Sequence, residues 1–544
     1  MKVVSVEQMR RIESAADASG ISYSTMMENA GRATAERVLE IIAGRENAQI
    51  TILIGPGNNG GDGLCAGRFI AQNSDALVRF YLLHKRPDDD THLNAVREMG
   101  LLVANMEDDQ RYRVLHHMVA SADVLLDALF GIGLRLPLRD DAARLLQNVR
   151  QAMNEAAAPI DPPTSVNPAL PQEQPAARTP YILAVDCPSG LDCDTGELDK
   201  HTLHADETIT FIAAKPGLLT FPGAEAVGHL RIALINIPET LPELREQKWR
   251  VADAASVRQM LPKRTGNAHK GSTGKALVVG GSRHYFGAPT LSAHAAYRAG
   301  AGLVEVAAPE AMIPTLAAGL HEAIWLPLPT DTGTPSAEHG GLIYEKASTA
   351  QAVLIGPGWG QAESTLELFT LLVEKAREGF PPLVIDADGL NLLTRLENWH
   401  DHLPQNTILT PHPGEMARLC GTDTKHIQAN RWQVASESAL AWSVVIVLKG
   451  AHTLIAAPSG EVTVLPFKTD ALAKAGTGDV LGGIITGLLA QGMAPYDAAV
   501  AGGYLHGLAG ITAARRTGST RSVIAGDVSE ALGEAFQQIE GVAR

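Results

Sequence analysis

Short apolar runs alternate with longer stretches of helical periodicity through most of the 544-residue chain. Short apolar runs bounded by turn residues are typical of strands in a parallel sheet, and the stretches between them predict the helices that cover it. Ser5 is placed to cap the first helix, ahead of the first strand. The predicted helices of this first series cover residues 5–20 and 24–44, and its predicted strands cover residues 49–55, 76–83, 123–131, 181–190, 207–213 and 230–237.

A second series of the same kind follows a charged, proline-punctuated segment at residues 237–271. The pattern therefore predicts two α/β domains, residues 1–240 and 266–544, joined by a linker at 241–265. The second series has predicted helices over residues 287–300 and 478–492 and predicted strands over residues 274–282, 301–309, 352–358, 382–389, 407–415, 444–450 and 452–458.

Residues 159–180 interrupt the first series with a proline-rich, polar segment that has no usable periodicity. Such composition is typical of a mobile surface excursion. The strand pattern resumes at residue 181, which favours a loop inside the first domain over a domain boundary by about two to one.

Composition narrows the class of protein. Sixty acidic against 45 basic residues give a net charge of −15, which disfavours nucleic acid as a partner. The four cysteines form no Cys-x-x-Cys pair, as expected for buried thiols in a reducing compartment. Charged residues occupy the start of the chain, where a signal peptide needs an apolar core, and no apolar run is long enough to span a membrane. We expect a soluble cytoplasmic protein, a homo-oligomer, that acts on small molecules.

Residues 55–63 (GPGNNGGDG) form a glycine-dense turn after the first predicted strand. Its Gly-x-Gly-x-x-Gly spacing matches a dinucleotide fingerprint, but the next strand ends in residues 81–90 (YLLHKRPDDD), with basic residues ahead of the expected acid. The redox interpretation is therefore weak. Such a turn still brings backbone N–H groups and the positive end of a helix toward an anion.

Two more strand ends in this domain carry polar groups, Asp127 ahead of a glycine loop and Asp186 ahead of Ser189. Each turn taken alone is more often a plain glycine turn. Together they would lie at one edge of a parallel sheet, where ligands bind. Asn59, Asp127 and Ser189 are oxygen donors suited to a hard cation.

Residues 474–483 (KAGTGDVLGG) are the strongest motif of the second domain. A glycine turn that opens a helix presents free N–H groups to a transferring phosphoryl group, and Asp479 at the helix start could take a proton from a substrate hydroxyl. An Asp-capped helix end alone does not need so many glycines. The chain has no Gly-x-x-x-x-Gly-Lys-Ser/Thr loop, which excludes a P-loop enzyme.

Three other segments of this domain are candidates of lower specificity. Residues 449–453 (KGAHT) lie between two predicted strands, where nucleotide phosphates could meet Lys449 and Thr453, although a plain hairpin turn has even odds. His412 is held between two prolines and could be purely structural. Asp386-x-Asp388 could bind a metal ion or could be a purely structural pair at a buried strand end, and the sequence favours neither alternative.

Four motifs of the first domain together resemble NAD(P)H-hydrate epimerases: residues 26–31 (MMENAG), 58–63 (NNGGDG), 127–133 (DALFGIG) and 185–190 (VDCPSG). The resemblance implies a Rossmann-like three-layer domain in which Asp186 contacts the hydrated nicotinamide as acid/base, and Asn59, Asp127 and Ser189 bind potassium. The insert at 159–180 is longer than this family leads us to expect. The resemblance also implies that the phosphates and sugars of the substrate contact Asn58, Asn59, Gly60, Gly61, Asp62, Gly131, Ile132, Gly133, Leu134, Arg135, Leu136 and Pro137.

The second domain resembles ADP-dependent NAD(P)H-hydrate dehydratases of ribokinase-like α/β fold over about residues 260–535. The motifs that carry this resemblance are residues 298–304 (RAGAGLV), 355–358 (IGPG), 386–391 (DADGLN), 410–415 (TPHPGE) and 474–483. It implies that Gly302, Gly358, His412 and the catalytic Asp479 face the hydrated dinucleotide. It further implies that the adenine nucleotide contacts Lys449, Gly450, Ala451, His452, Thr453, Gly476 and Gly478.

These resemblances imply a metabolite-repair enzyme with two activities. The first domain would interconvert the R and S hydrates of NAD(P)H. The second would phosphorylate the S hydrate with ADP and Mg²⁺, which releases AMP. It would then eliminate phosphate to regenerate NAD(P)H. The alternative is a ribokinase-like kinase for a vitamin precursor, fused to a non-catalytic nucleotide-binding module.

Overall fold

The computed structural model describes residues 1–157, 179–377 and 379–541. The chain divides into two compact units, an N-terminal unit of Lys2–Gln247 and a C-terminal unit of Lys248–Arg544 that also includes Met1. Most of the insert predicted at 159–180 lies outside the described residues. The strands on either side of it, β4 and β5, pair in one sheet, so both flanks of the insert belong to the N-terminal unit.

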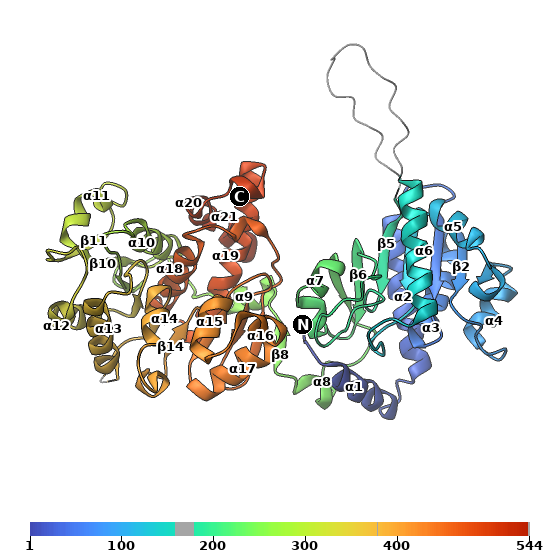
Figure 1. Cartoon of the computed structure of the whole chain (residues 1–544), viewed down its shortest axis with the longest axis horizontal. Coiled ribbons are helices and arrows are strands. Elements are labelled where there is room, and N and C mark those ends of the chain that lie inside the picture. Colours follow the sequence, from blue (N-terminus) through green and yellow to red (C-terminus); the bar gives the residue numbers. More distant parts are fainter. Residues whose placement is uncertain (158–178, 378, 542–544) are drawn as a thin grey trace, which may run out of the picture. The chain divides into compact units, whose positions relative to one another are not determined.

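The N-terminal unit is built on a seven-stranded sheet in the order β3-β2-β1-β4-β5-β6-β7, with every neighbouring pair parallel. This is the Rossmann order, in which the direction of winding reverses between β1 and β4. Its strands are β1 (Gln49–Ile54), β2 (Leu77–Leu82), β3 (Leu102–Asn105), β4 (Val124–Ala128), β5 (Tyr181–Val185), β6 (Glu207–Phe211) and β7 (His229–Ala233). Figure 1 labels β2, β5 and β6 of this sheet.

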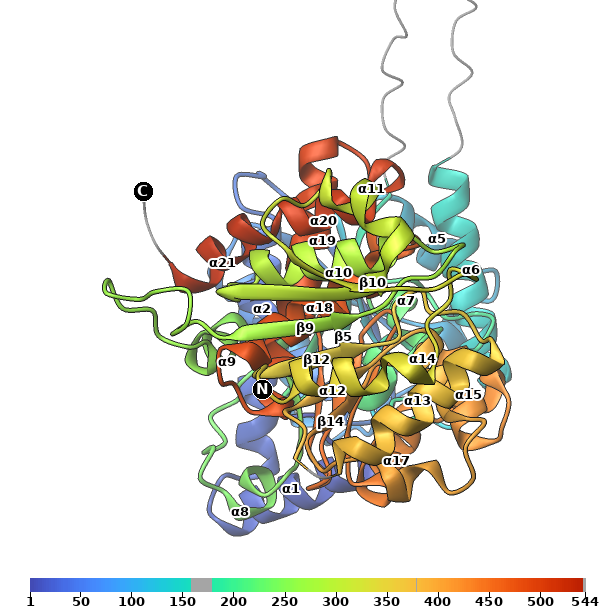
Figure 2. The same cartoon turned by 90° about the vertical axis from the view of Figure 1, so that its left-hand side faces the viewer.

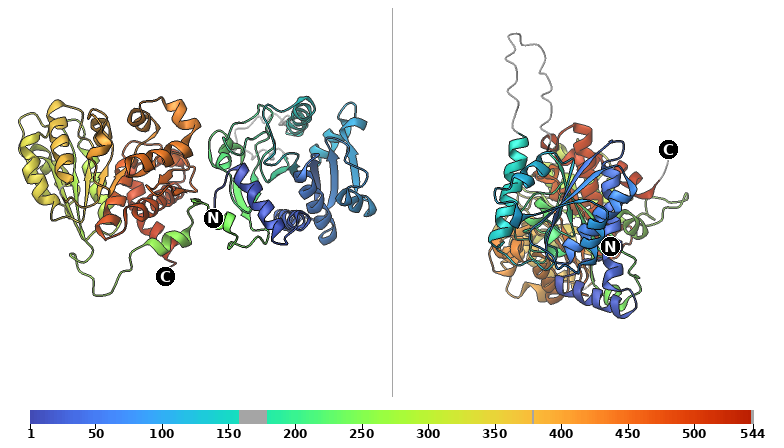
Figure 3. Two further views of the ribbon diagram at one scale, coloured as in Figure 1. Left: turned by 90° about the horizontal axis from the view of Figure 1, so that it is seen from below. Right: turned by 90° about the vertical axis from the view of Figure 1, so that its right-hand side faces the viewer.

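Helices cover both faces of this sheet, because both sets of alternate strand residues are apolar. Ile50, Ile52 and Ile54 pack with helices α1 to α4, whereas Leu53 packs with α5 and α6. Figure 3 shows the blue helices and the teal α6 on opposite sides of the sheet. The helices are α1 (Val6–Ala18), α2 (Tyr23–Ile41), α3 (Asn58–Asn73), α4 (Thr91–Glu98), α5 (Arg113–Ala120), α6 (Asp140–Ala156), α7 (Gly223–Ala226) and α8 (Pro242–Arg245). The predicted cap of α1 is confirmed, since Ser5 accepts a hydrogen bond from the backbone N–H of Gln8.

The C-terminal unit contains a ten-stranded sheet in the order β11-β10-β9-β12-β13-β14-β15-β16-β17-β8. The strands from β11 to β15 are parallel, and the pairs β15–β16 and β16–β17 are antiparallel. Figure 2 shows this unit from the side on which β10, β9 and β12 are visible. The strands are β8 (Trp249–Val251), β9 (Lys275–Val279), β10 (Leu303–Pro309), β11 (Ile324–Leu328), β12 (Ala352–Ile355), β13 (Leu383–Ile385), β14 (Thr407–Leu409), β15 (Val445–Leu448), β16 (Leu454–Ala456) and β17 (Val462–Val464).

The segment expected to be a linker, residues 241–265, is largely ordered structure. It contains α8, then β8, which pairs with β17 of the large sheet, and α9. The helices of the C-terminal unit are α9 (Ala254–Met260), α10 (Gly287–Arg298), α11 (Ile313–Ala317), α12 (Gly340–Ala347), α13 (Glu363–Ala376), α14 (Asp388–Leu393), α15 (Pro413–Cys420), α16 (Thr424–Ala429), α17 (Arg431–Trp442), α18 (Thr477–Ala490), α19 (Pro495–Thr517), α20 (Ala525–Glu530) and α21 (Leu532–Glu540).

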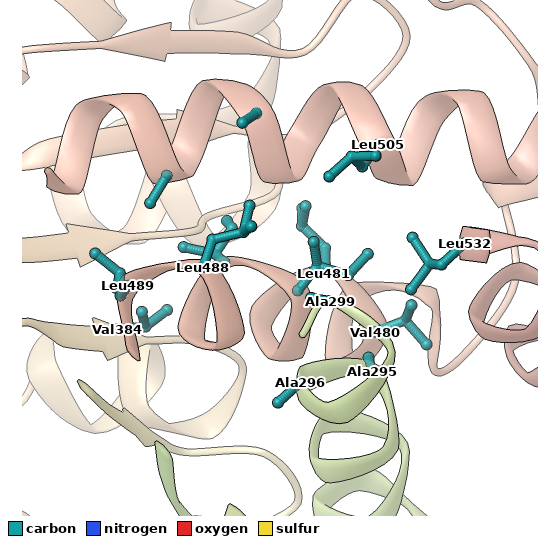
Figure 4. Close-up of a cluster of buried hydrophobic side chains, with 14 of the residues drawn as sticks. Ala295, Ala296, Ala299, Val384, Val480, Leu481, Leu488, Leu489, Leu505 and Leu532 are labelled. Atoms are coloured by element: carbon teal, nitrogen blue, oxygen red, sulfur yellow. The ribbon is translucent and has the colours of Figure 1, made fainter. Parts of the chain in front are cut away.

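Close packing of α10, α18 and α19 forms the main core of this unit, as Figure 4 shows for Val480, Leu488 and Leu505. A Cβ added at Gly483 would lie 2.1 Å from a backbone oxygen of α10, so only glycine allows the two helices to approach this closely. The packing holds the start of α18 in place. No helix in the described part of the chain combines the length and hydropathy needed to cross a membrane.

Candidate functional sites

The glycine turn of the N-terminal unit lies where the winding of the sheet reverses, at the carboxyl ends of β1 and β4. A Cβ on Gly55 would lie 1.7 Å from the carbonyl oxygen of Leu129, so the loops after the two strands touch. Gly57 caps α3 without a side-chain hydrogen bond, which leaves backbone N–H groups of the first turn available to an anion. A cavity of about 660 Å³ opens here.

Asp186 is the central polar group of this cavity. Its Oδ1 accepts hydrogen bonds from Lys215 Nζ at 2.7 Å and Thr210 Oγ1 at 3.1 Å, and its Oδ2 accepts from the backbone N–H of Ile132 at 3.2 Å. Burial opposes the charge on Lys215, but the adjacent Asp186 carboxylate outweighs it and raises the lysine pKa. Asp186 has a left-handed backbone (φ 65°), a strain of order 1–3 kcal/mol that is found mostly at functional sites.

Two further acids face this ion pair. Burial raises the pKa of Asp62 well above its usual range, and the charges of Asp186 and Glu13 raise it further. Burial also raises the pKa of Glu13, where Lys215 opposes the shift and Asp186 adds to it. All four groups line the same cavity. The site therefore sets two acids with raised pKa values beside the Asp186–Lys215 ion pair.

Asn59 is the best evidence for a cation in this unit. It is buried, and neither its Oδ1 nor its Nδ2 has a hydrogen-bond partner among the described residues. Asp127 and Ser189, in contrast, bond to each other, with Ser189 Oγ donating to Asp127 Oδ1 at 2.6 Å. Burial raises the pKa of Asp127, and the hydrogen bonds from Ser189 oppose this. The donor set fits a hard cation, because a buried amide oxygen without a partner is costly unless a ligand occupies it.

The structure places most of the predicted epimerase residues at this cavity. Asn58, Asn59, Asp62, Gly131, Ile132, Gly133, Leu134 and Asp186 line it. Gly60 and Gly61 instead pack inward, against the carbonyl of Gly55 and the side chain of Met27. Arg135 lines an adjoining cavity of about 490 Å³ that shares Gly133 and Leu134 with the first, and Leu136 and Pro137 line neither.

Sequence reasoning missed Lys215, Thr210 and Glu13. Lys215 could have been found, because it is the only charged residue in the run FIAAKPG that follows a predicted strand. Its closeness to Asp186 depends on β5 and β6 being neighbours in the sheet. Glu13 carries no such signal, since it is one of several charged residues on α1.

In the C-terminal unit, Asp479 lies in the first turn of α18. Gly476 caps this helix with φ 87° and no side-chain hydrogen bond, and the N–H of Thr477 bonds to the carbonyl of Lys474 at 3.4 Å. A helix start without a side-chain cap is a candidate anion site. Burial raises the pKa of Asp479 to about 7, Asp386 and Asp388 contribute to the rise, and Lys449 opposes it. A carboxylate with this pKa suits a general base near neutral pH.

Lys449 connects the strand ends around Asp479. Its Nζ donates to Asp386 Oδ1 at 2.8 Å and lies 3.7 Å from Glu415 Oε2. Burial opposes the charge on Lys449, but Asp386 and Glu415 together raise its pKa. The lysine therefore stays charged inside the protein. Asp386, for which structure and metal binding had equal weight, is the buried partner of this lysine.

A cavity of about 480 Å³ lies beside this network and has the mixed lining that a nucleotide requires. Phe467, Leu472 and Leu481 supply apolar walls, and Lys449 and Thr453 supply polar groups.

His506, which sequence reasoning missed, also lines this cavity. It is 8% exposed, and its Nε2 has no partner among the described residues. Burial lowers its pKa to about 4, and a backbone hydrogen bond with Thr477 opposes the shift. The imidazole is thus neutral, with a nitrogen free for a ligand.

Five more predicted dehydratase residues are at this edge of the sheet. Gly450 and Ala451 line the cavity, as does Gly478, where an added Cβ would lie 3.5 Å from Lys449 Nζ. His412 lines it too and caps α15, its Nδ1 accepting from the N–H of Gly414 at 3.0 Å. Burial, with Lys449 and Arg418, lowers the pKa of His412. Gly358 follows β12 with φ 67° and packs against Tyr285.

Two predicted residues are placed differently. His452 is buried, and its Nδ1 pairs with the carbonyl of Leu465 at 3.1 Å, so its side chain faces the protein interior and not the cavity. Gly302 lies at the amino ends of β9 and β10, where its N–H bonds to Gly274. That edge adjoins Ala490, the last residue of α18. Asp479 lies in the first turn of the same helix, about 17 Å away along its axis. The structure does not bring Gly302 to the site.

The fold and the two sites define an enzyme of two α/β units, one with a buried acid/base pair and one with a base beside a nucleotide-sized cavity. Residues 276–533 match the family model for NAD(P)H-hydrate dehydratase, and residues 24–217 match the model for YjeF-related protein N-terminus. The chain belongs to the family of bifunctional NAD(P)H-hydrate repair enzymes.

Full-length relatives show this membership directly. The chain is 36% identical to the bifunctional NAD(P)H-hydrate repair enzyme of Moorella thermoacetica, over 99% of this chain and 97% of that protein. Identity is 33% to the enzyme of the same description from Escherichia coli, over 97% and 92%. The crystal structure of the ADP/ATP-dependent NAD(P)H-hydrate dehydratase of Bacillus subtilis, co-crystallised with ATP/Mg²⁺, is 32% identical over 54% of this chain and 99% of that one, with a TM-score of 0.46. The expected fold class, Rossmann-like followed by ribokinase-like, is confirmed by the sheet topology and the family matches.

Proposed function

We propose that this chain repairs hydrated NAD(P)H in two steps, at two separate sites. The N-terminal unit interconverts the R and S hydrates. The C-terminal unit uses ADP to convert the S hydrate back to NAD(P)H, with AMP and phosphate as the other products. The observation that carries the proposal is Asp479, a base with a pKa of about 7 at an uncapped helix start beside Lys449. The full-length match to bifunctional relatives extends it to both units.

In the N-terminal unit, Asp186 is the acid/base that contacts the hydrated ring. Lys215 pairs with its carboxylate, and the backbone N–H of Ile132 fixes the orientation of Oδ2. Glu13 and Asp62, whose pKa values are raised, supply protons from other walls of the cavity. The uncapped N–H groups at the start of α3 bind the substrate phosphates.

In the C-terminal unit, Asp479 takes the proton of the substrate hydroxyl, and the oxygen attacks the terminal phosphorus of ADP while AMP leaves. N–H groups at the start of α18 and the Lys449 ammonium stabilise the negative charge of the transferring group. The ring nitrogen then donates its electron pair, and the carbon–oxygen bond breaks with departure of phosphate. Loss of a proton from the neighbouring carbon restores the double bond.

Two cations complete the proposal. Asn59, Asp127 and Ser189 would hold K⁺, which would offset the charge of the substrate phosphates, and the unpartnered amide of Asn59 supports this assignment. Mg²⁺ would neutralise the ADP phosphates. We further propose a cytoplasmic homo-oligomer; the four cysteines are all free, as in a reducing compartment.

The kinase alternative is not favoured. A non-catalytic N-terminal module has no need for a buried, strained acid paired with a lysine, and the relatives match over both units. A kinase for a vitamin precursor would also release a stable phosphorylated product.

The test incubates the full chain with separated R and S hydrates, with and without ADP, and follows the recovery of NADH absorbance. We expect S to be repaired at once and R after a lag, both only with ADP. Asp479→Asn should abolish dehydration and keep epimerisation, measured by chromatography of the two hydrates; Asp186→Ala should do the reverse. Loss of both activities in either variant would contradict the two-site proposal.

A further inference from the structure

Three metal-ligating side chains meet between α2, α3 and α4, apart from the ligand cavity. Cys65 Sγ lies 3.1 Å from His92 Nδ1 and 3.7 Å from Glu28 Oε1, and His92 Nδ1 lies 3.7 Å from the same carboxylate oxygen. Cys65 is fully buried on α3, while Glu28 on α2 and His92 on α4 are half-buried. Within the described residues this is the only group of at least three Cys, His or acidic side chains with metal-binding spacing.

The spacing of these atoms matches the ligands of a tetrahedral metal ion. Zinc bonds of about 2.3 Å to sulfur and about 2.0–2.2 Å to nitrogen and oxygen place the ligand atoms roughly 3.4–3.6 Å apart. The three observed separations each lie within about 0.5 Å of that range. We propose that Glu28, Cys65 and His92 bind Zn²⁺, with water from the half-exposed side as the fourth ligand.

The surrounding groups orient these ligands. Arg68 is paired with Glu28 Oε2, which leaves Oε1 directed at the thiol and the imidazole. Asp90 caps α4 by accepting from the backbone N–H of His92 at 3.1 Å, which places the imidazole. Partners of this kind fix the orientation of metal ligands in known zinc sites. A thiolate with an imidazole selects zinc over magnesium or calcium.

Zinc binding would affect the glycine turn at residues 55–63 through Asp90. Its Oδ2 accepts from Arg86 Nε at 2.7 Å, and Arg86 Nη1 donates to the carbonyls of Gly55 and Gly57 at 2.7 and 3.1 Å. An ion that joins α4 to α3 therefore holds Arg86 against the glycine turn. Burial and the Glu28 charge raise the pKa of the Cys65 thiol, so zinc would displace about one proton on binding.

The experiment strips the full chain with a chelator and titrates it with Co²⁺, a spectroscopic substitute for zinc. We expect one Co²⁺ per chain with near-ultraviolet sulfur-to-cobalt charge-transfer absorption, which Zn²⁺ then abolishes by competition. Zn²⁺ at 100 times its dissociation constant should raise the melting temperature of the N-terminal unit by about 5–10 °C.

Variants assign the ligands. Cys65→Ala should remove the charge-transfer band, His92→Ala should weaken Co²⁺ binding at least about tenfold, and the control Cys420→Ala, in the other unit, should change neither. If circular dichroism shows that Cys65→Ala does not fold, Co²⁺ binding by His92→Ala, which replaces only a half-buried side chain, provides the test. Absence of stoichiometric binding to the wild type, or an unchanged band in Cys65→Ala, would show that the three groups form only a hydrogen-bonded cluster. Epimerisation is assayed separately, so that a failure to bind metal can be distinguished from a failure of the proposed function.

Discussion

The pKa of Asp479 leads to a quantitative prediction for the pH dependence of dehydration. Burial and the charge of Asp386 together raise this pKa to about 7, and the charge of Lys449 opposes the rise. Only the ionised carboxylate can accept the substrate proton. The ionised fraction rises from about one-tenth at about pH 6 to about nine-tenths at about pH 8, so kcat/KM for dehydration should increase roughly tenfold across this interval.

Variants of the neighbouring charged residues test whether the fall in kcat/KM at low pH, the acid limb of the profile, reflects protonation of Asp479. Asp386→Asn removes a like charge and should move the limb to lower pH. Lys449→Met removes an opposite charge and should move it to higher pH. Both side chains lie near the nucleotide cavity, so the position of the limb is compared and not the absolute rate. Asp401→Asn, an exposed carboxylate of the same unit, is the matched control and should leave the profile unchanged.

The assay follows NADH absorbance with the S hydrate and saturating ADP in buffers of constant ionic strength. Opposite displacements by the two variants would support Asp479 as the base. A limb that does not move in either variant, or that moves in the same direction in both, would refute the reasoning and point to a titrating group on ADP.

Three further predictions follow from individual contacts. His506→Leu should raise the KM for ADP by about tenfold and leave epimerisation unchanged, because a hydrogen-bond donor on the nucleotide loses the Nε2 of His506, which has no partner among the described residues; an unchanged KM in steady-state kinetics would exclude this role. Lys215→Met removes the cationic partner of the buried Asp186 carboxylate, so urea unfolding should show a loss of about 3–5 kcal/mol, partly restored by adding Asp186→Asn. Gly483→Ala forces α10 and α18 apart and should cost about 1–3 kcal/mol and most dehydratase activity, whereas Gly526→Ala, with open space around it, should not; equal melting temperatures for both variants would contradict the packing argument.

Most central strands were predictable, and three of the four edge strands were not. β1, β4, β9 and β12 are buried on both faces and therefore appear as continuous apolar runs. β3, β8 and β11 lie at or next to sheet edges, are only partly buried and lack such runs, so their sequences carry little signal. The same reason explains why residues 241–265 resembled a linker: β8 is three residues long and is a strand only because β17 lies beside it.

The candidate sites divide in the same way. Glycine turns, the acids that follow strands and the start of α18 are local features. The sequence alone was therefore enough to identify Asp186 and Asp479 as candidate site residues and to identify the family to which the chain belongs. The partners of these acids, Lys215 for Asp186 and Asp386 for Lys449, depend on which strands are neighbours. The expectation that Gly302 faces the substrate rested on the resemblance alone, although the predicted strand at residues 301–309 already placed this glycine at an amino end.

Ionisation was decided by the tertiary structure alone. The raised pKa of Asp479 and the lowered pKa of His506 both come from burial and from charges on segments remote in the chain. The zinc-ligating group proposed between α2, α3 and α4 has no sequence signature either, because its three ligands meet only when these helices pack. Residue types and local turns thus defined the available chemistry, whereas desolvation and proximity, which depend on packing, determined which groups carry charge and which act together.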